Sequence, residues 1–200
     1  MFDPFLMRHL TPVMDRGGRI LAAAGISANA VTWTGFAVGL GGAAAIAADH
    51  YGWGLGLILA NRAMDGLDGA VARASRRTDL GGYLDIVLDF IFYGVVTAAF
   101  AVADPARAVA AAFLLASFMA TAASFLGFAI IAARRGLTTD TYEHKSFFFS
   151  WGLAEGGETI AFLVAVCIWP TLFTPLAYVF ATLCWITAVQ RIALARDVFK

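Results

Sequence analysis

Long stretches without a charged residue constrain this chain more than any other feature of its sequence. Residues 20–48, 108–133 and 159–190 contain no Asp, Glu, Lys or Arg. Apolar stretches longer than about 18 residues are typical of membrane-spanning helices. Charged residues make up only 14% of the 200 residues, whereas about a quarter is usual in a soluble domain. The sequence therefore predicts an all-α integral membrane protein.

Six transmembrane helices are expected, and turn signals or charges separate them. Their expected ranges are about 30–48, 51 into the acidic segment 61–90, 82–102, 108–133, 147–169 and 175–195. Pro170 and Pro175 divide the last apolar stretch, which is too long for one helix. No internal repeat is evident, and we expect residues 1–200 to form one domain.

The first 20 residues mix Phe and Leu with Arg and Asp, which is typical of an amphipathic helix in the membrane interface. We expect Pro12 and the pair Gly17 and Gly18 to interrupt this helix. An exposed tail is the alternative. No cleavable signal peptide is expected, because the segment lacks a compact basic-then-apolar pattern and a small-residue cleavage site.

Basic residues gather on one side of the expected membrane, which predicts the orientation of the helices. The termini and the loops after the second and fourth spans carry Arg8, Arg16, Arg19, Arg73, Arg76, Arg77, Arg134, Arg135, Lys145, Arg191, Arg196 and Lys200. The other side has only Arg107. We therefore expect both termini and the acidic segment on the cytoplasmic side of the cell (inner) membrane.

Net charge and cysteine positions argue against other classes of protein. The 14 basic and 14 acidic residues balance, so there is no electrostatic case for binding nucleic acid. Cys167 and Cys184 both lie in apolar stretches. We expect them to pack as small hydrophobic residues rather than to form a disulfide.

Five aspartates gather in the segment 61–90: Asp65, Asp68, Asp79, Asp85 and Asp89. Asp65 and Asp68 are three residues apart and share one helix face, and Asp85 and Asp89 are four apart and share another. A hairpin of the two helices would bring four carboxylates together, and their repulsion would require cations. Carboxylates suit hard ions such as Mg²⁺, Mn²⁺ or Ca²⁺. Two such ions about 4 Å apart suit phosphoryl transfer.

Small and basic residues accompany these acids. Gly66, Gly69, Ala70 and Ala72 either leave a helix face open to a substrate or allow close helix packing. Arg73 has two interpretations, a contact to a diphosphate or a membrane anchor. Anchoring is the expectation for Arg76 and Arg77, and Asp79 is expected to be a solvated loop charge or a local helix cap.

This segment resembles the motif of the CDP-alcohol phosphatidyltransferase family at eight positions over 25 residues. It reads Asp65-x-x-Asp68-Gly69-x-x-Ala72-Arg73, followed by Gly81-x-x-x-Asp85-x-x-x-Asp89. Seven residues separate Arg73 from Gly81, where the usual motif has eight, so the register holds only with Gly81 rather than Gly82 as the motif glycine. We expect the turn between the helices to absorb this difference. Six spans with cytoplasmic ends and an interfacial N-terminal helix also resemble the family.

The resemblance implies a role for each matching residue. Asp65, Asp68 and Asp85 would bind two divalent cations, Mg²⁺ or Mn²⁺, and Asp89 would touch one of them and act as the general base. Asp65, Gly69 and Arg73 would contact the CDP moiety, with Thr78 as a weaker candidate. Residues 28–31 resemble the nucleotide-contacting start of the first span, where Asn29 either contacts the nucleotide or caps the helix.

The implied reaction transfers a phosphatidyl group from a CDP-alcohol, CDP-diacylglycerol above all, to an acceptor alcohol with release of CMP. Lys145 either binds the acceptor or anchors the chain. Glu155 and Glu158 either hold the acceptor or pair with Arg62 or Lys145. Serine or another small polar alcohol fits this mixture, and glycerol 3-phosphate, inositol phosphate, choline and phosphatidylglycerol are the alternatives. The resemblance also implies a homodimer.

Two other classes of function compete with this interpretation. A cation transporter or channel would use the aspartates as its ion path, and a membrane scaffold would use them to hold a structural ion. A conduction path should place polar residues through the depth of several helices. The acids gather at one end instead, with glycines and Arg73 between them, which favours the enzyme.

Overall fold

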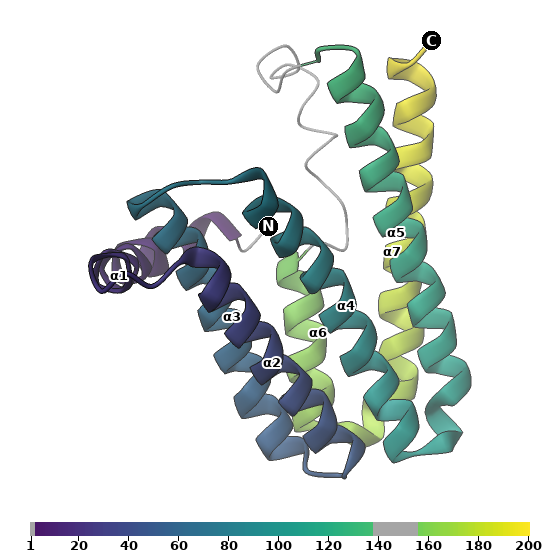
Figure 1. The fold of residues 1–200 in the computed structure, drawn as a ribbon. Coiled ribbons are helices and arrows are strands. Elements are labelled where there is room, and N and C mark those ends of the chain that lie inside the picture. The colour runs from purple at the N-terminus through teal and green to yellow at the C-terminus, as the bar shows by residue number, and fades with distance from the viewer. Residues whose placement is uncertain (1–2, 138–155) are drawn as a thin grey trace. The chain divides into compact units, whose positions relative to one another are not determined.

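The computed structural model describes residues 3–137 and 156–200, with the backbone alone for residues 3–10. Within these ranges the chain is all-helical and has no β-strand. The helices are α1 (Asp3–Ala23), α2 (Ala28–Ala47), α3 (Tyr51–Ala74), α4 (Asp79–Ala103), α5 (Ala108–Arg134), α6 (Gly156–Ile168) and α7 (Phe173–Val198), with short 3₁₀ turns η1 (Pro105–Arg107) and η3 (Pro170–Leu172) (Figure 1). The predicted all-α class is confirmed.

Within residues 3–137 and 156–200, four segments are long and apolar enough to cross a membrane: Ala28–Ala47, Asp79–Ala103, Pro105–Arg134 and Pro170–Val198. They correspond to the first, third, fourth and sixth expected spans. Helix α3 is 24 residues long but carries the charged motif, and α6 has 13 described residues. The expected number of six spans therefore remains a prediction, while membrane insertion through several apolar helices stands.

The described residues form two compact units, Met1–Pro105 and Ala106–Lys200. In the first unit, α2, α3 and α4 run side by side, and α1 lies at the end where α3 ends and α4 begins (Figure 1). Helix α2 packs against both α3 and α4. The two aspartate-bearing helices, α3 and α4, thus share α2 as a common support.

Small residues on α2 explain how two helices approach it so closely. A Cβ atom added at Gly35 would lie 3.0 Å from Cβ of Met64 on α3. One added at Gly39 would lie 2.8 Å from the Phe92 ring on α4. Asn61 of α3, only 4% exposed, donates a hydrogen bond of 2.8 Å from Nδ2 to the Gly35 carbonyl. Small residues allow helices in membranes to come into close contact, and this face of α2 is used inside the chain.

Helix α1 is continuous through Pro12, so the interruption expected there is wrong. Helix α1 also continues through Gly17 and Gly18, so the interruption expected at this pair is wrong as well. These two glycines serve close packing instead. A Cβ atom at Gly18 would lie 2.6 Å from the backbone carbon of Ala70, and one at Gly17 would lie 2.9 Å from Cδ2 of Leu67. The pair therefore lets α1 approach α3, while a position of α1 in the membrane interface stays a prediction.

The second unit is built on packing between α5 and α7, with α6 beside η3 and α7. Phe162 of α6 stacks on Phe180 of α7 with ring centroids 4.9 Å apart. Helix α7 begins at Phe173, so Pro175 lies inside its first turn, where a missing backbone N–H costs little. Cys167 and Cys184 are buried and free, which confirms their predicted role as packing residues.

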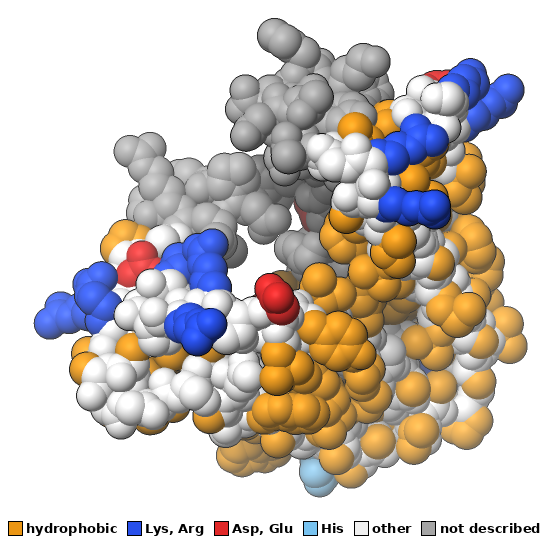
Figure 2. All heavy atoms as spheres, turned by 45° about the horizontal axis from the view of Figure 1, so that its top comes forward, with side chains coloured by type: hydrophobic (Ala, Val, Ile, Leu, Met, Phe, Trp, Pro, Cys, Tyr) orange, Lys and Arg blue, Asp and Glu red, His pale blue; other side chains and the backbone are white. Residues whose placement is uncertain are grey.

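Hydrophobic side chains cover much of the visible surface of the helices, as a membrane protein requires (Figure 2). In the first unit, Lys and Arg side chains gather at the end that carries the motif (Figure 2). Arg73, Arg76 and Arg77 are all exposed there. This separation of apolar and basic surface supports the expected orientation, which itself stays a prediction.

Candidate active site

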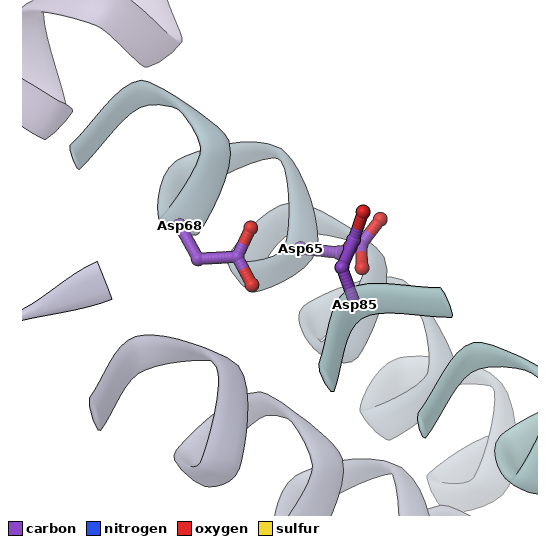
Figure 3. Close-up of side chains that lie close together, drawn as sticks. All are labelled: Asp65, Asp68 and Asp85. Atoms are coloured by element: carbon purple, nitrogen blue, oxygen red, sulfur yellow. The ribbon is translucent and has the colours of Figure 1, made fainter. Parts of the chain in front are cut away.

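Three motif carboxylates converge where α3 faces α4. Asp65 and Asp68 project from α3 and Asp85 from α4, and their side chains point toward a common space (Figure 3). One carboxylate oxygen from each lies within 4.8 Å of the others. Asp68 is 6% exposed, whereas Asp85 is exposed. Two helices therefore supply three negative charges to one small volume.

This donor set fits a hard divalent cation. The three candidate ligand atoms are carboxylate oxygens, which Mg²⁺ and Mn²⁺ prefer over the nitrogen and sulfur ligands of softer metals. Three carboxylates this close repel each other strongly, and a cation removes that repulsion. Asp65, Asp68 and Asp85 are the residues that would hold such an ion.

The fourth motif carboxylate is engaged by an arginine. Asp89 accepts a hydrogen bond of 2.8 Å through Oδ1 from Nη2 of Arg62. Nη1 of the same guanidinium lies 3.5 Å from Oδ2 of Asp65. Asp89 Oδ2 is 3.5 Å from the Tyr93 hydroxyl. The structure therefore brings Asp65, Asp68 and Asp85 together as possible metal ligands. Asp89 lies beside them and is paired with Arg62.

Arg62 is held in place on every side of its guanidinium. Its side chain is only 11% exposed. Nε donates a hydrogen bond of 2.8 Å to Oδ1 of Asn61, and Nη1 donates one of 3.3 Å to the Tyr93 hydroxyl. The guanidinium carbon lies 4.6 Å from the centroid of the Phe92 ring, within the range of a cation–π contact. Arg62 is thus a fixed cation of the chain itself, next to two motif carboxylates.

Asp68 has a partner on the supporting helix. The Thr32 hydroxyl of α2 donates a hydrogen bond of 2.6 Å to Asp68 Oδ2. A carboxylate accepts more than one contact, so this bond leaves the other oxygen of Asp68 for a ligand. Thr32 fixes the direction of the buried carboxylate.

A cleft beside the acids collects the residues expected to contact the nucleotide. Its lining includes Asn29, Gly69, Arg73 and Thr78, and also Thr32, Asp68 and Asp85 from the acid cluster. The acid cluster and the cleft therefore form one continuous site on the first unit. Arg76 and Arg77, expected as membrane anchors, line this cleft as well.

The start of α2 and the start of α4 meet at one wall of the cleft. Ser27 is the N-cap of α2, and its hydroxyl accepts a hydrogen bond of 3.2 Å from the Ala30 backbone N–H. The capping alternative for Asn29 is therefore wrong. Thr78 caps α4 by accepting a bond of 3.0 Å from the Gly81 N–H. A Cβ atom at Gly81 would lie 3.3 Å from Oδ1 of Asn29, whereas one at Gly82 would meet nothing within 4 Å among the described residues.

This close approach agrees with Gly81 as the motif glycine. The turn before it is one residue shorter than in the usual motif and ends at the helix cap Thr78; that this turn absorbs the difference stays a prediction. Asp79 is the first residue of α4 and is exposed. It is therefore not the cap of that helix.

The small residues of α3 had two possible roles, close helix packing or a face open to a substrate. Both roles occur, because these residues lie on different faces of the helix. Ala70 is buried against Gly18, and a Cβ atom at Gly66 would lie 3.7 Å from Sδ of Met14. Gly69 and Ala72 line the cleft. Packing against α1 therefore explains the first pair, and an open binding face explains the second.

The comparisons with known proteins agree with the motif. Residues 25–193 match the family described as CDP-alcohol phosphatidyltransferase. The chain belongs to the CDP-alcohol phosphatidyltransferase family. It is therefore an enzyme of a family that transfers a phosphatidyl-type group from a CDP-alcohol.

Two curated relatives of this CDP-alcohol phosphatidyltransferase differ in how much of the chain they cover. The inner membrane protein YnjF of Escherichia coli (strain K12) is 42% identical over 193 residues, 96% of this chain and 94% of the relative. The archaetidylinositol phosphate synthase of Methanothermobacter thermautotrophicus (strain ATCC 29096 / DSM 1053 / JCM 10044 / NBRC 100330 / Delta H) is 35% identical over 96 residues, 48% of this chain and 46% of the relative.

The acceptor residues expected for this CDP-alcohol phosphatidyltransferase stay untested. Lys145 and Glu155 lie outside the described residues. Glu158 lies in the first turn of α6, in the second unit. Its predicted role toward the acceptor remains a prediction. The alternative partner Arg62 is already engaged by Asp89 and Asp65.

Sequence reasoning did not assign to this site several side chains that shape it. They are Asp15, Thr32, Asn61, Arg62 and Tyr93. Arg62 carried a signal, because it is a charged residue three positions before Asp65 in an apolar helix and shares its face. The sequence around Thr32 and Asp15 gave no indication of their contacts, because their partners lie 36 and 58 residues away.

Proposed function

We propose that this enzyme transfers the phosphatidyl group of CDP-diacylglycerol to a small polar alcohol, releasing CMP, as a step of phospholipid biosynthesis at the cytoplasmic face of the inner membrane. One observation carries the proposal. Asp68 and Asp85 belong both to the acid cluster and to the lining of the adjoining cleft, where Asn29, Gly69 and Arg73 also lie. A diphosphate in this cleft would lie next to the carboxylates that bind its counter-ions.

In the proposed reaction, the chain's own residues bind the nucleotide and move one proton. Asn29, Gly69, Arg73 and Thr78 line the pocket for CDP, and Arg73 offsets charge on the diphosphate. Asp89 takes the proton from the acceptor hydroxyl, and the resulting oxygen attacks the β-phosphorus. The bond from this phosphorus to the bridging oxygen breaks, and CMP leaves with those electrons. A general base of this kind contributes about 10²–10⁴ in rate.

Two divalent cations, Mg²⁺ or Mn²⁺, would be held by Asp65, Asp68, Asp85 and Asp89. Such ions, when bound, neutralise the diphosphate and stabilise negative charge on the transferring phosphoryl group. Asp65, Asp68 and Asp85 already point into one volume. Asp89 Oδ1 accepts the hydrogen bond from Arg62, so its Oδ2 is the oxygen that would touch a cation.

The position of the site suits a lipid donor. The acids lie near the end of α3 and the start of α4, at the same end of the unit as the exposed basic residues (Figure 2). A site at this depth leaves acyl chains in hydrocarbon and the nucleotide in water. A homodimer is part of the proposal, as the family resemblance implies.

Serine or another small polar alcohol is the proposed acceptor, bound with the help of Lys145, Glu155 and Glu158. The name of the archaeal relative, archaetidylinositol phosphate synthase, supports testing inositol phosphate beside it. Glycerol 3-phosphate, choline and phosphatidylglycerol complete the set of alternatives.

Release of CMP by the purified protein tests the proposal. CDP-diacylglycerol is offered with Mg²⁺ or Mn²⁺ and with one acceptor at a time: serine, inositol phosphate, glycerol 3-phosphate, choline, glycerol or phosphatidylglycerol. We expect release with one acceptor, loss of release on chelation, and recovery when the cation is restored. Asp85→Asn should be inactive, while Asp197→Asn, an exposed carboxylate of the second unit, should retain activity. A protein that neither binds CDP nor releases CMP would overturn the proposal.

A further inference from the structure

The motif arginine is tied to the N-terminal helix. Nη2 and Nε of Arg73 donate hydrogen bonds of 2.7 and 3.2 Å to the same oxygen, Oδ1 of Asp15. Arg73 lies in the last turn of α3 and Asp15 lies on α1. The two residues are 58 positions apart in the chain. The contact therefore depends on how α1 packs against α3.

This ion pair divides the guanidinium into two parts. The edge formed by Nε and Nη2 faces Asp15, whereas Nη1 lies 3.4 Å from the position that a Cβ atom would take at Gly69. Gly69 and Arg73 both line the cleft. In the part of the chain whose side chains are described, Nη1 donates no hydrogen bond. Asp15 thus holds one edge of the guanidinium while the other is free for an anion over a glycine.

The packing of α1 places Asp15 at this point. Met14, Gly17 and Gly18 lie against Gly66, Leu67 and Ala70 of α3. A Cβ atom at Gly18 would lie only 2.6 Å from the Ala70 backbone. Such close packing permits little sliding between the helices. Asp15 consequently reaches the level of Arg73, four residues beyond Gly69.

The contact contributes little to stability. The side chains of Arg73 and Asp15 are 41% and 34% exposed, and ion pairs of this exposure are worth little because solvent screens them. An arginine with several rotatable bonds nevertheless loses freedom when it binds a ligand, and fixing it beforehand improves affinity. The value of the pair therefore lies in orienting Arg73.

We propose that Asp15 is a positioning residue that holds the Arg73 guanidinium ready for the diphosphate of the CDP donor. This inference rests on the proposed nucleotide role of Arg73. Through Asp15, the N-terminal helix becomes part of the nucleotide site without touching the substrate itself.

The test measures CDP binding by calorimetry with Mg²⁺ and CMP release with CDP-diacylglycerol, using the full-length protein. Asp15→Asn keeps the volume and removes the charge, and it should weaken CDP binding about two- to tenfold. The KM for the donor should rise while kcat changes less than twofold. Asp15→Glu should recover most of the affinity, because its carboxylate still reaches the guanidinium. Asp197→Asn removes an exposed ion-pair carboxylate of the second unit and should change neither quantity.

A double-mutant cycle separates the possible failures. Asp15→Asn should have no effect on CDP binding in the Arg73→Ala background, since Asp15 acts through Arg73. If the wild-type protein binds no CDP, or if Arg73→Ala binds CDP normally, the proposed nucleotide site is wrong and this inference falls with it. If Arg73→Ala weakens binding and Asp15→Asn does not, only the role of Asp15 is wrong. If Asp15→Asn weakened CDP binding equally in the Arg73→Ala background, the role of Asp15 would also be wrong.

Discussion

Asp89 combines two properties that a general base at this site requires. Its Oδ1 accepts a hydrogen bond of 2.8 Å from Arg62, which fixes the carboxylate. Among the side chains that the structure describes, its Oδ2 makes only a long contact of 3.5 Å with the Tyr93 hydroxyl. One oxygen therefore orients the group while the other remains available for the proton of an acceptor.

Asp89→Asn tests this assignment directly. The amide oxygen can still accept from Arg62, so the local fold should persist, but the side chain can no longer take a proton. We expect CMP release to fall about 10²–10⁴-fold and CDP affinity to stay within about threefold. Single-turnover CMP release and CDP calorimetry measure the two quantities. An Asp89→Asn enzyme of normal activity would remove Asp89 as the base.

Arg62→Gln tests the fixed cation next to the acids. Loss of its charge leaves Asp65 and Asp89 less neutralised, so the affinity for Mn²⁺ should rise several-fold through stronger Coulomb attraction. Without metal, the free energy of unfolding should fall by about 1.5–3 kcal/mol, the range for a hydrogen bond to a charged group. Manganese titration by electron paramagnetic resonance and thermal unfolding in chelator provide the measurements.

An exposed arginine supplies the control for Arg62→Gln. Arg135→Gln, in the second unit, should affect neither metal affinity nor activity. Weaker Mn²⁺ binding by Arg62→Gln would mean that Arg62 orders the carboxylates rather than competing with the metal.

At the scale of the elements, the contact between α1 and α3 links a terminal helix to the motif. Gly66 and Ala70, inside the motif segment of α3, form part of the surface that receives α1. The same helix pair carries the contact of Asp15 with Arg73. Packing of α1 should therefore affect nucleotide binding as well as stability.

Gly18→Ala should force α1 away from α3, because the added Cβ atom would lie 2.6 Å from the Ala70 backbone. Overpacking of this kind costs about 1–3 kcal/mol. We expect a lower unfolding temperature and weaker CDP binding. Gly56→Ala is the matched control, because a Cβ atom there meets nothing within 4 Å among the described residues. Equal behaviour of the two variants would contradict the close packing of α1 and α3.

Helix α2 shows where local sequence patterns stop being informative. Its small residues are typical of a face that packs closely against another helix, and Gly35 and Gly39 do so. The pattern did not indicate the partners, which are Met64 of α3 and Phe92 of α4. Thr32 of the same helix fixes Asp68, a contact that no spacing rule predicts.

At the scale of the whole molecule, the distribution of basic residues predicts the orientation in the membrane. Both termini and the motif should face the cytoplasm. A C-terminal green fluorescent protein fusion should therefore fluoresce, whereas a C-terminal alkaline phosphatase fusion should be inactive. A cysteine introduced at Arg77, near the motif, should react with a membrane-impermeant thiol reagent only after the cells are opened. One introduced at Arg107 should react in intact cells, and the reverse pattern would contradict the orientation.

The sequence by itself determined the membrane class, several of the apolar helices and the acidic motif, because apolar stretches and spacings of three or four residues are local properties of the chain. Asp65 and Asp68 could be placed on one helix face without a structure. Only the tertiary structure decided that α2 supports both motif helices, that Arg62 engages Asp89, and that Asp15 reaches Arg73. The Arg62–Asp89 and Asp15–Arg73 pairs join residues 27 and 58 positions apart, and such pairs depend on how helices pack rather than on any pattern within one helix.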